Sequence, residues 1–280
     1  MTKTWLITGS TRGFGRELSH AVLEHGDNLV ATARKPEQLD YLLDRFGSRV
    51  RTFALDVTDD QAAQAAVAYA VDQFGSLDVV VNNAGFANSS PIEETTDADF
   101  RSQLETNLFG TVNVSKAALP IMRAQRSGTI VQFSSVGGRV GGTPGMGAYQ
   151  TAKFAVEGFS EVLANEVGPL GIRVMIVEPG AFRTDWQGSS MTLHAVGADY
   201  ADTVGAINAY RVANSSNQPG DPARAAAVIV KTINEGNLPM RLVLGADAVS
   251  MIQAAAAIRA AETEAWATVS ASADFPAGAS

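Results

Sequence analysis

The chain has 280 residues and a mass of 29.3 kDa, with 46% hydrophobic and 18% charged residues, which is enough apolar surface for a folded core. Its formal net charge of -8 repels phosphate backbones and anionic lipids, so we expect neither nucleic acid nor a membrane as a partner. The sequence contains no cysteine and only three dispersed histidines, which excludes disulfides and thiolate chemistry and argues against a metal site.

The N-terminal apolar run covers only residues 5–7, which is too short for a signal peptide. No segment reaches the roughly 18 apolar residues that a membrane-spanning helix needs. The sequence therefore predicts a cytoplasmic protein.

Short apolar segments alternate with helical stretches along the chain. The expected strands are 4–8, 29–32, 50–55, 79–81, 130–133, 174–177 and 241–244. Nearly unbroken apolar runs are typical of parallel strands that helices cover on both faces. Helix starts are predicted at Thr58, with Gln61 as its capping-box partner, and at Thr96. This order predicts an α/β fold: one doubly wound, Rossmann-like domain over residues 1–280, with a mainly parallel sheet of about seven strands.

Two regions interrupt the alternation. Residues 185–220 form a long segment of mixed character, which we interpret as a substrate-binding lid. Residues 254–280 are rich in alanine and end in a Pro/Gly/Ser sequence, so we expect a C-terminal tail that frays.

A glycine-rich loop follows the first strand and precedes a helix. Gly9, Gly13 and Gly15 would permit a tight turn, close approach to a diphosphate, and close packing of helix on sheet. Because the strand-loop-helix context is present, the loop is a strong candidate for dinucleotide binding.

Four motifs in the same order resemble the classical short-chain dehydrogenase/reductase family. They are Thr-Gly-x-x-x-Gly-x-Gly from Thr8, Asn-Asn-Ala-Gly at 82–85, Tyr149-x-x-x-Lys153, and Pro179-Gly180. Together the motifs cover about residues 3–185. The resemblance implies an oxidoreductase with a nicotinamide dinucleotide as cofactor. It also implies a set of cofactor-binding residues: Gly9, Thr11, Arg12, Gly13, Phe14, Gly15, Arg34, Asp56, Val57, Asn83, Gly85, Tyr149, Lys153, Pro179, Gly180 and Thr184.

The residues after the second strand favour NADP over NAD. A carboxylate at this point would bind the ribose 2′-hydroxyl of NAD, whereas arginine accommodates a 2′-phosphate. Ala33 occupies the position, Arg34 follows it, and Arg12 in the glycine loop supplies a second cation. We interpret the two arginines as a phosphate clamp and expect NADP(H) to be preferred, with NAD(H) still possible.

Tyr149 and Lys153 are four residues apart in a helical stretch, so both lie on one face. An ordinary tyrosine has a pKa near 10, and we expect the lysine ammonium and an oxidised nicotinamide to lower it. Tyr149 would then transfer the proton.

The resemblance supplies the other two catalytic candidates. Ser135 matches the family serine that binds the substrate oxygen, although its spacing from Tyr149 is one residue longer than usual, which leaves Ser134 as an alternative. Asn107 matches the asparagine that bends its helix and links the lysine to a proton relay.

The sequence thus predicts hydride transfer between NADP(H) and a ketone, aldehyde or secondary alcohol. Two alternatives stay open: a non-catalytic dinucleotide-sensing protein, and a dehydratase or epimerase that uses the same tyrosine. The apolar residues expected around the substrate predict a small, lipophilic, uncharged molecule; they are Phe86, Val140, Met146, Phe182, Trp186, Met191, Leu193, Val196 and Tyr200. The helices expected at 99–122 and 149–167 resemble those that pair in family oligomers, so we predict a homo-oligomer, either tetramer or dimer.

Overall fold

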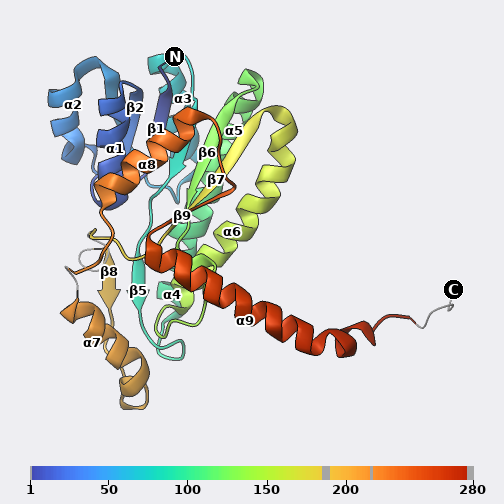
Figure 1. Cartoon of the computed structure of the whole chain (residues 1–280). Helices are drawn as coiled ribbons and strands as arrows, with labels where there is room; N and C mark the ends of the chain where they lie inside the picture. The colour runs from blue at the N-terminus through green and yellow to red at the C-terminus, as the bar shows by residue number, and fades with distance from the viewer. Residues whose placement is uncertain (1, 185–189, 215–216, 276–280) are drawn as a thin grey trace.

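The computed structural model describes residues 2–184, 190–214 and 217–275, and its centre is a parallel sheet of seven strands (Figure 1). The strands run in the spatial order β3-β2-β1-β4-β6-β7-β9. Their bounds are β1 Thr4–Ile7, β2 Asn28–Ala33, β3 Val50–Ala54, β4 Val79–Asn82, β6 Gly128–Phe133, β7 Ile172–Pro179 and β9 Arg241–Leu244. Each of the seven predicted strands is present, and the predicted doubly wound fold is confirmed.

Helices cover both faces of the sheet. On one face lie α1 (Gly13–His25), α2 (Asp40–Phe46) and α8 (Pro222–Glu235), packed on a core that includes Trp5 and Ile7. On the other face lie α3 (Asp60–Phe74), α5 (Gly110–Gln125) and α6 (Gly147–Val167), packed on a core that includes Leu6. Successive side chains of β1 thus enter opposite cores, which explains why its sequence is apolar without alternation.

The topology brings the predicted motifs to one edge of the sheet. All seven strands are parallel, so their carboxyl ends meet at the same edge. The glycine loop follows β1, residues 83–85 follow β4, and Pro179 ends β7. Chain order reverses between the neighbours β1 and β4, which is where doubly wound sheets bind ligands.

A small second sheet lies beyond this edge (Figure 1). It pairs β5 (Ala87–Ser89) with β8 (Met191–Leu193) in parallel, and α7 (Ala206–Ala213) follows it. Both strands have only three residues and were not predicted. The segment 190–214 of the predicted lid belongs to this unit, whereas residues 185–189 and 215–216 lie outside the described residues.

Of the two helix starts predicted at Thr58 and Thr96, the structure agrees with only the second. The cap of α3 is Asp59, whose carboxylate accepts from the amides of Gln61 and Ala62, whereas the Thr58 hydroxyl donates to Asp56. The capping box at Thr58 is therefore wrong, because Asp56 and Thr58 form a turn of their own. The start at Thr96 is confirmed, since its hydroxyl accepts from Asp99 N at the beginning of α4 (Asp97–Leu104).

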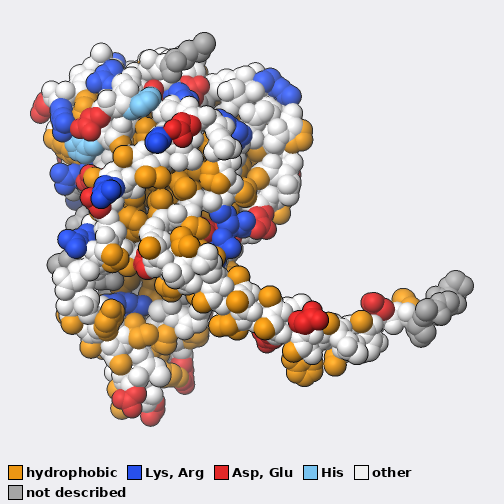
Figure 2. Space-filling model, viewed as in Figure 1, with side chains coloured by type: hydrophobic (Ala, Val, Ile, Leu, Met, Phe, Trp, Pro, Cys, Tyr) orange, Lys and Arg blue, Asp and Glu red, His pale blue; other side chains and the backbone are white. Residues whose placement is uncertain are grey.

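The C-terminal region is a long helix. α9 (Ala246–Ala271) includes most of the segment for which a fraying tail was predicted, and it projects away from the body (Figure 1). The prediction of a fraying tail is wrong for residues up to Ala271, because the many alanines of this segment favour a helix intrinsically. Apolar side chains lie exposed along it (Figure 2), among them Ile258 and Trp266. Within the described residues no helix is both long enough and apolar enough to span a bilayer.

Candidate active site

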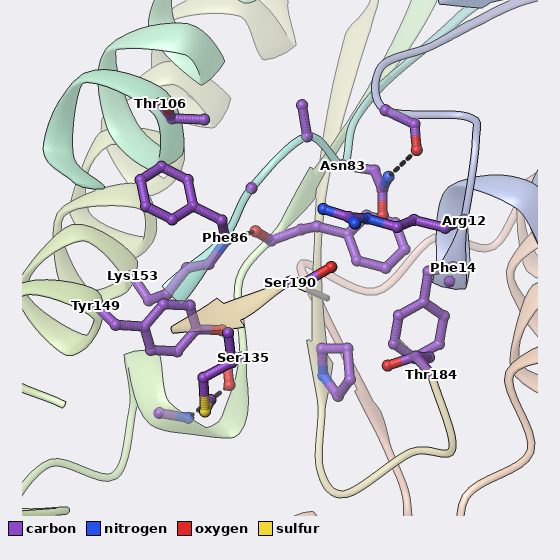
Figure 3. Close-up of a pocket in the computed structure, with 18 of the residues that line it drawn as sticks. Arg12, Phe14, Asn83, Phe86, Thr106, Ser135, Tyr149, Lys153, Thr184 and Ser190 are labelled. Atoms are coloured by element: carbon purple, nitrogen blue, oxygen red, sulfur yellow. Dashed lines mark hydrogen bonds between the residues drawn. The ribbon is translucent and has the colours of Figure 1, made fainter. Parts of the chain in front are cut away.

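A cavity of about 1820 Å³ opens at the carboxyl edge of the sheet and gathers almost every predicted site residue. Figure 3 shows Arg12, Phe14, Asn83, Ser135, Tyr149, Lys153 and Thr184 arranged around it. Of the predicted catalytic and cofactor-binding residues, only Gly15 and Asn107 do not line the cavity. Both are buried behind the cavity wall. Asn107 is hydrogen-bonded to the backbone of Phe86, and Gly15 lies close to the carbonyl oxygen of Gly9.

The glycine loop requires glycine at two positions for different reasons. Gly9 has φ +68°, a left-handed conformation that side chains disfavour. At Gly15 the constraint is space, because a Cβ would lie 2.1 Å from the carbonyl oxygen of Gly9. The first turn of α1 carries no acidic residue, and Arg12 at its cap makes no side-chain capping bond. The loop therefore offers uncapped amides and a positive helix end to an anion.

Asn83 fastens the glycine loop to the end of β4. Its amide nitrogen Nδ2 donates to the carbonyl oxygens of Thr8 (2.9 Å) and Gly9 (3.2 Å). The hydroxyl of Thr8 in turn accepts from the backbone amides of Asn83 and Ala84. These four bonds hold the two loops at the chain reversal in fixed register, which is a positioning role for Asn83.

Positively charged side chains follow the end of β2 and line the cavity. Ala33 is buried, and the next residues, Arg34 and Lys35, are exposed and line the cavity together with Arg12. Lys35 was not among the predicted cofactor residues, although its position directly after Arg34 could have suggested it. Asp56 also lines the cavity but is oriented by bonds from the Thr58 amide and hydroxyl.

Tyr149 and Lys153 lie on the cavity-facing side of α6 and are both buried. The Lys153 Nζ donates to the carbonyl oxygen of Phe133 (2.6 Å) and lies 5.8 Å from the centre of the Tyr149 ring. The Tyr149 hydroxyl is hydrogen-bonded to the side chain of Ser135, and Ser135 Oγ also accepts from Gly137 N (3.0 Å). A phenol, an ammonium and a hydroxyl therefore converge at one point of the cavity wall (Figure 3).

Burial dominates the titration of this group. Desolvation raises the pKa of Tyr149 to about 12, and the hydrogen bond with Ser135 opposes that shift only in part. Desolvation also lowers the pKa of Lys153 to about 8, against the opposing charge of Glu157. Burial therefore raises the pKa of Tyr149, and the lowering expected from Lys153 together with an oxidised nicotinamide stays a prediction.

The two candidate serines differ in their surroundings. Ser135 bonds Tyr149, whereas Ser134 Oγ is buried without a hydrogen-bond partner in the described residues and packs where a Cβ on Gly138 would stand. The geometry favours Ser135 as the residue that acts with Tyr149.

Asn107 supports the cavity wall from behind. It is fully buried in a π-helical turn at 105–109 that joins α4 to α5. Its Oδ1 accepts from Phe86 N (3.0 Å) and its Nδ2 donates to Phe86 O (2.8 Å). The predicted helix distortion is therefore present at Asn107, and its amide positions Phe86 in the cavity wall.

Three aromatic rings form the floor beside the glycine loop. Phe14 packs against Phe133 and Phe182, with ring centres 5.5 and 5.1 Å apart.

The loop after β7 is held by Asp247 at the start of α9, whose carboxylate accepts from Ala181 N (2.8 Å). A Cβ on Gly180 would lie 2.5 Å from the same carboxylate, so a larger residue there would displace Asp247.

The cavity includes only some of the apolar residues that were predicted to surround the substrate. Phe86, Met146, Phe182 and Met191 line the cavity. Four further predictions are wrong, because these side chains do not reach the cavity: Val140, Leu193, Val196 and Tyr200. The Tyr200 hydroxyl donates instead to Glu93, outside the cavity. Trp186 lies outside the described residues.

Arg211 also lines the cavity, although it was not predicted from the sequence. Nothing in the local sequence of α7 distinguishes this arginine from one on a solvated helix face. Only the packing of α7 against β5 brings it into the cavity wall.

Residues 3–193 match the family model for short chain dehydrogenase, which is 191 of the 280 residues. The chain belongs to this family. It is 48% identical to "Oxidoreductase BOA17" of Botryotinia fuckeliana, over 95% of this chain and 97% of that protein. Its structure resembles a short-chain dehydrogenase from Streptomyces avermitilis with a TM-score of 0.90, at 39% identity over 98% and 99% of the two chains. The structure of ElxO with NADP bound is similar with a TM-score of 0.71, at 29% identity over 87% and 96%.

Proposed function

We propose that this oxidoreductase prefers NADP and transfers a hydride between the nicotinamide and a carbonyl or alcohol carbon. The observation that carries the proposal is the convergence of Tyr149, Lys153 and Ser135 in the cavity that the glycine loop also enters. In this mechanism the bound nicotinamide supplies the hydride, and the chain supplies orientation and the proton.

The residues present fit a dinucleotide. The missing side chain at Gly15, the uncapped start of α1 and the cations of Arg12 and Arg34 suit a diphosphate and an additional phosphate. The last residue of β2 is Ala33, at the position where a carboxylate would bind the ribose of NAD. The similarity to ElxO, whose structure holds NADP, supports the same preference.

Tyr149 is the proton donor in the reductive direction. Its raised pKa keeps the phenol protonated at neutral pH, so it can donate to the oxygen of a carbonyl as negative charge develops there. Ser135 bonds the Tyr149 hydroxyl and can donate to the same oxygen, which lowers the energy of the developing alkoxide. Lys153 is held by Phe133 O, and its positive charge favours the phenolate that remains.

The apolar lining by Phe86, Met146 and Met191 supports a substrate with a lipophilic body. A cytoplasmic location and closure of the 185–220 lid remain predictions from the sequence. So does assembly into a homo-oligomer, which gains support from Phe109, Phe154 and Val162, all exposed on the π-helical turn or α6.

Two alternatives make different predictions. A dinucleotide sensor would not need catalytic side chains, yet the sequence carries all four candidates: Asn107, Ser135, Tyr149 and Lys153. A dehydratase or epimerase would not consume NADPH in proportion to product.

The test is NADPH absorbance with a panel of aryl ketones, aliphatic ketones, sugars and oxo acids. Tyr149→Phe should abolish turnover and leave NADPH binding intact, because only the phenolic hydroxyl is lost. Ser135→Ala should lose about 10²-fold or more in kcat, in the range for one oxyanion donor. Ser134→Ala is the matched control and should lose much less. Retained turnover in Tyr149→Phe would refute the mechanism, and a reversed serine order would refute the assignment of Ser135.

A further inference from the structure

Arg211 places a cation in the cavity wall, and no carboxylate of the described residues forms an ion pair with it. Its Nη1 donates to Ser89 Oγ (3.0 Å) and to Asn208 Oδ1 (3.1 Å), and Ser89 Oγ donates to the same amide oxygen (2.7 Å). Among the described residues no acid forms an ion pair with it, and burial lowers its pKa with no opposing charge. A partly buried guanidinium that lacks a counter-charge is costly, and an anionic ligand would offset that cost.

The position of Arg211 assigns it to the substrate rather than to the cofactor phosphates. Ser89, which holds it, is two residues beyond Ala87 in β5, a displacement of about 7 Å along a strand. Ala87 packs with Met146 and Tyr149. The arginines assigned to the cofactor, Arg12 and Arg34, follow β1 and β2 in the main sheet.

The guanidinium is oriented so that part of it remains available. The neutral groups of Ser89 and Asn208 engage Nη1 alone, and Nε and Nη2 make no hydrogen bond among the described residues. Two donors of one guanidinium match the two oxygens of a carboxylate. The cavity that Arg211 lines also has apolar side chains in its wall, among them Met146, Met191 and Ile207.

We propose that Arg211 binds a carboxylate of the substrate, so that the substrate is an oxo acid or hydroxy acid with an apolar chain between its two polar ends. The proposal rests on the proposed function and deepens it. It replaces the expectation of an uncharged substrate while it keeps the lipophilic body. Arg211 is then the residue that selects the substrate, and Ser89 and Asn208 are positioning residues that hold it.

The kinetic test compares a medium-chain oxo acid with its own methyl ester, which has the same carbonyl and chain but no charge. The wild type should favour the acid by at least about tenfold in kcat/KM, the lower end for a charged hydrogen bond. Arg211→Gln should lower kcat/KM for the acid by about 10- to 100-fold, mainly through KM, and change the ester less than about threefold. Arg211→Lys should retain part of the preference. Arg224→Gln, on the exposed surface of α8 and outside the cavity lining, is the matched control and should change neither substrate.

A binding measurement separates this proposal from the hydride-transfer mechanism. Calorimetry on the cofactor-free wild type should detect octanoate binding that is at least about tenfold tighter than binding of octanamide, whether or not any carbonyl is reduced. Thermal melting establishes that Arg211→Gln is folded, and where it is not, the wild-type comparisons decide. Equal or weaker binding of the carboxylate, or a preference for the ester, would overturn the proposal. Octanoate binding without any turnover would support it and count against the proposed function instead.

Discussion

The buried ammonium of Lys153 makes the stability of the protein depend on pH in a way that can be measured without a substrate. Its pKa in the folded chain is lowered from 10.5 to about 8, because burial removes water from the charged form. Between these two values the unfolded chain binds more protons than the folded chain does. Stability must therefore rise with pH across this window, and the cost of the buried charge is fully present below about pH 8.

The size of the effect follows from the two pKa values. Raising the pH from about 7 to about 9.5 should add roughly 2 kcal/mol to the free energy of unfolding. Tyr149 contributes with the opposite sign, since its pKa is raised from 10.0 to about 12. The stability that neutral Tyr149 provides is present below about pH 10 and is lost only as the pH rises toward 12, so it does not interfere in this range.

Urea unfolding of the cofactor-free protein at several pH values measures the slope. Lys153→Met removes the titrating group, so the increase in unfolding free energy between about pH 7 and about pH 9.5 should be smaller by about 2 kcal/mol. The comparison uses only this increase, because the variant also loses the hydrogen bond to Phe133 O and its absolute stability will differ. Lys231→Met is the matched control, because Lys231 is 73% exposed and its replacement leaves the buried Lys153 in place. The same pH dependence in wild type and Lys153→Met would refute the argument that Lys153 is buried as an ammonium.

Further outcomes test the cofactor site and the assembly. Gly15→Ala should destabilise the protein by roughly 1–3 kcal/mol and weaken NADP binding, because the added methyl group meets the carbonyl oxygen of Gly9. Gly158→Ala, on the exposed side of α6, is the control and should stabilise the protein by roughly 0.5–1 kcal/mol. Melting temperatures that shift in the same direction for both variants would contradict this. Arg12→Ala and Arg34→Ala should each weaken NADP binding about tenfold and leave NAD nearly unchanged, and equal wild-type affinity for both cofactors by calorimetry would reject the clamp. Light scattering at micromolar concentration should give a dimer or tetramer mass, and a monomer mass would reject assembly.

The sequence predicts the main sheet well because burial on both faces leaves a strong signal. The run Trp5-Leu6-Ile7 is apolar throughout, since its side chains enter both cores. β5 gives no such signal, because it has three residues, of which Asn88 and Ser89 are polar. Its pairing with β8 joins Ala87 to Met191, more than a hundred residues away, and depends on packing that no local pattern records.

The candidate site divides in the same way. Its loops follow strand ends and carry motifs, so Gly9, Asn83, Tyr149 and Lys153 could be named as candidates from those motifs and the family resemblance that they carry. Arg211 could not, because its place in the cavity results from the docking of α7 on β5 through Ser89 and Asn208. The titration of Tyr149 could not be predicted either. The direction of its pKa shift depends on how far the phenol is buried, which sequence spacing does not determine.

Isotope transfer tests the proposed hydride transfer most directly. The enzyme would be given NADPH that carries deuterium in place of both hydrogens at the reactive nicotinamide carbon, together with the best carbonyl substrate from the panel. Mass spectrometry should find the alcohol product one mass unit heavier, with one NADPH consumed for each product molecule, and no product from Tyr149→Phe. Product that forms without deuterium, or without loss of NADPH, would contradict hydride transfer by this site.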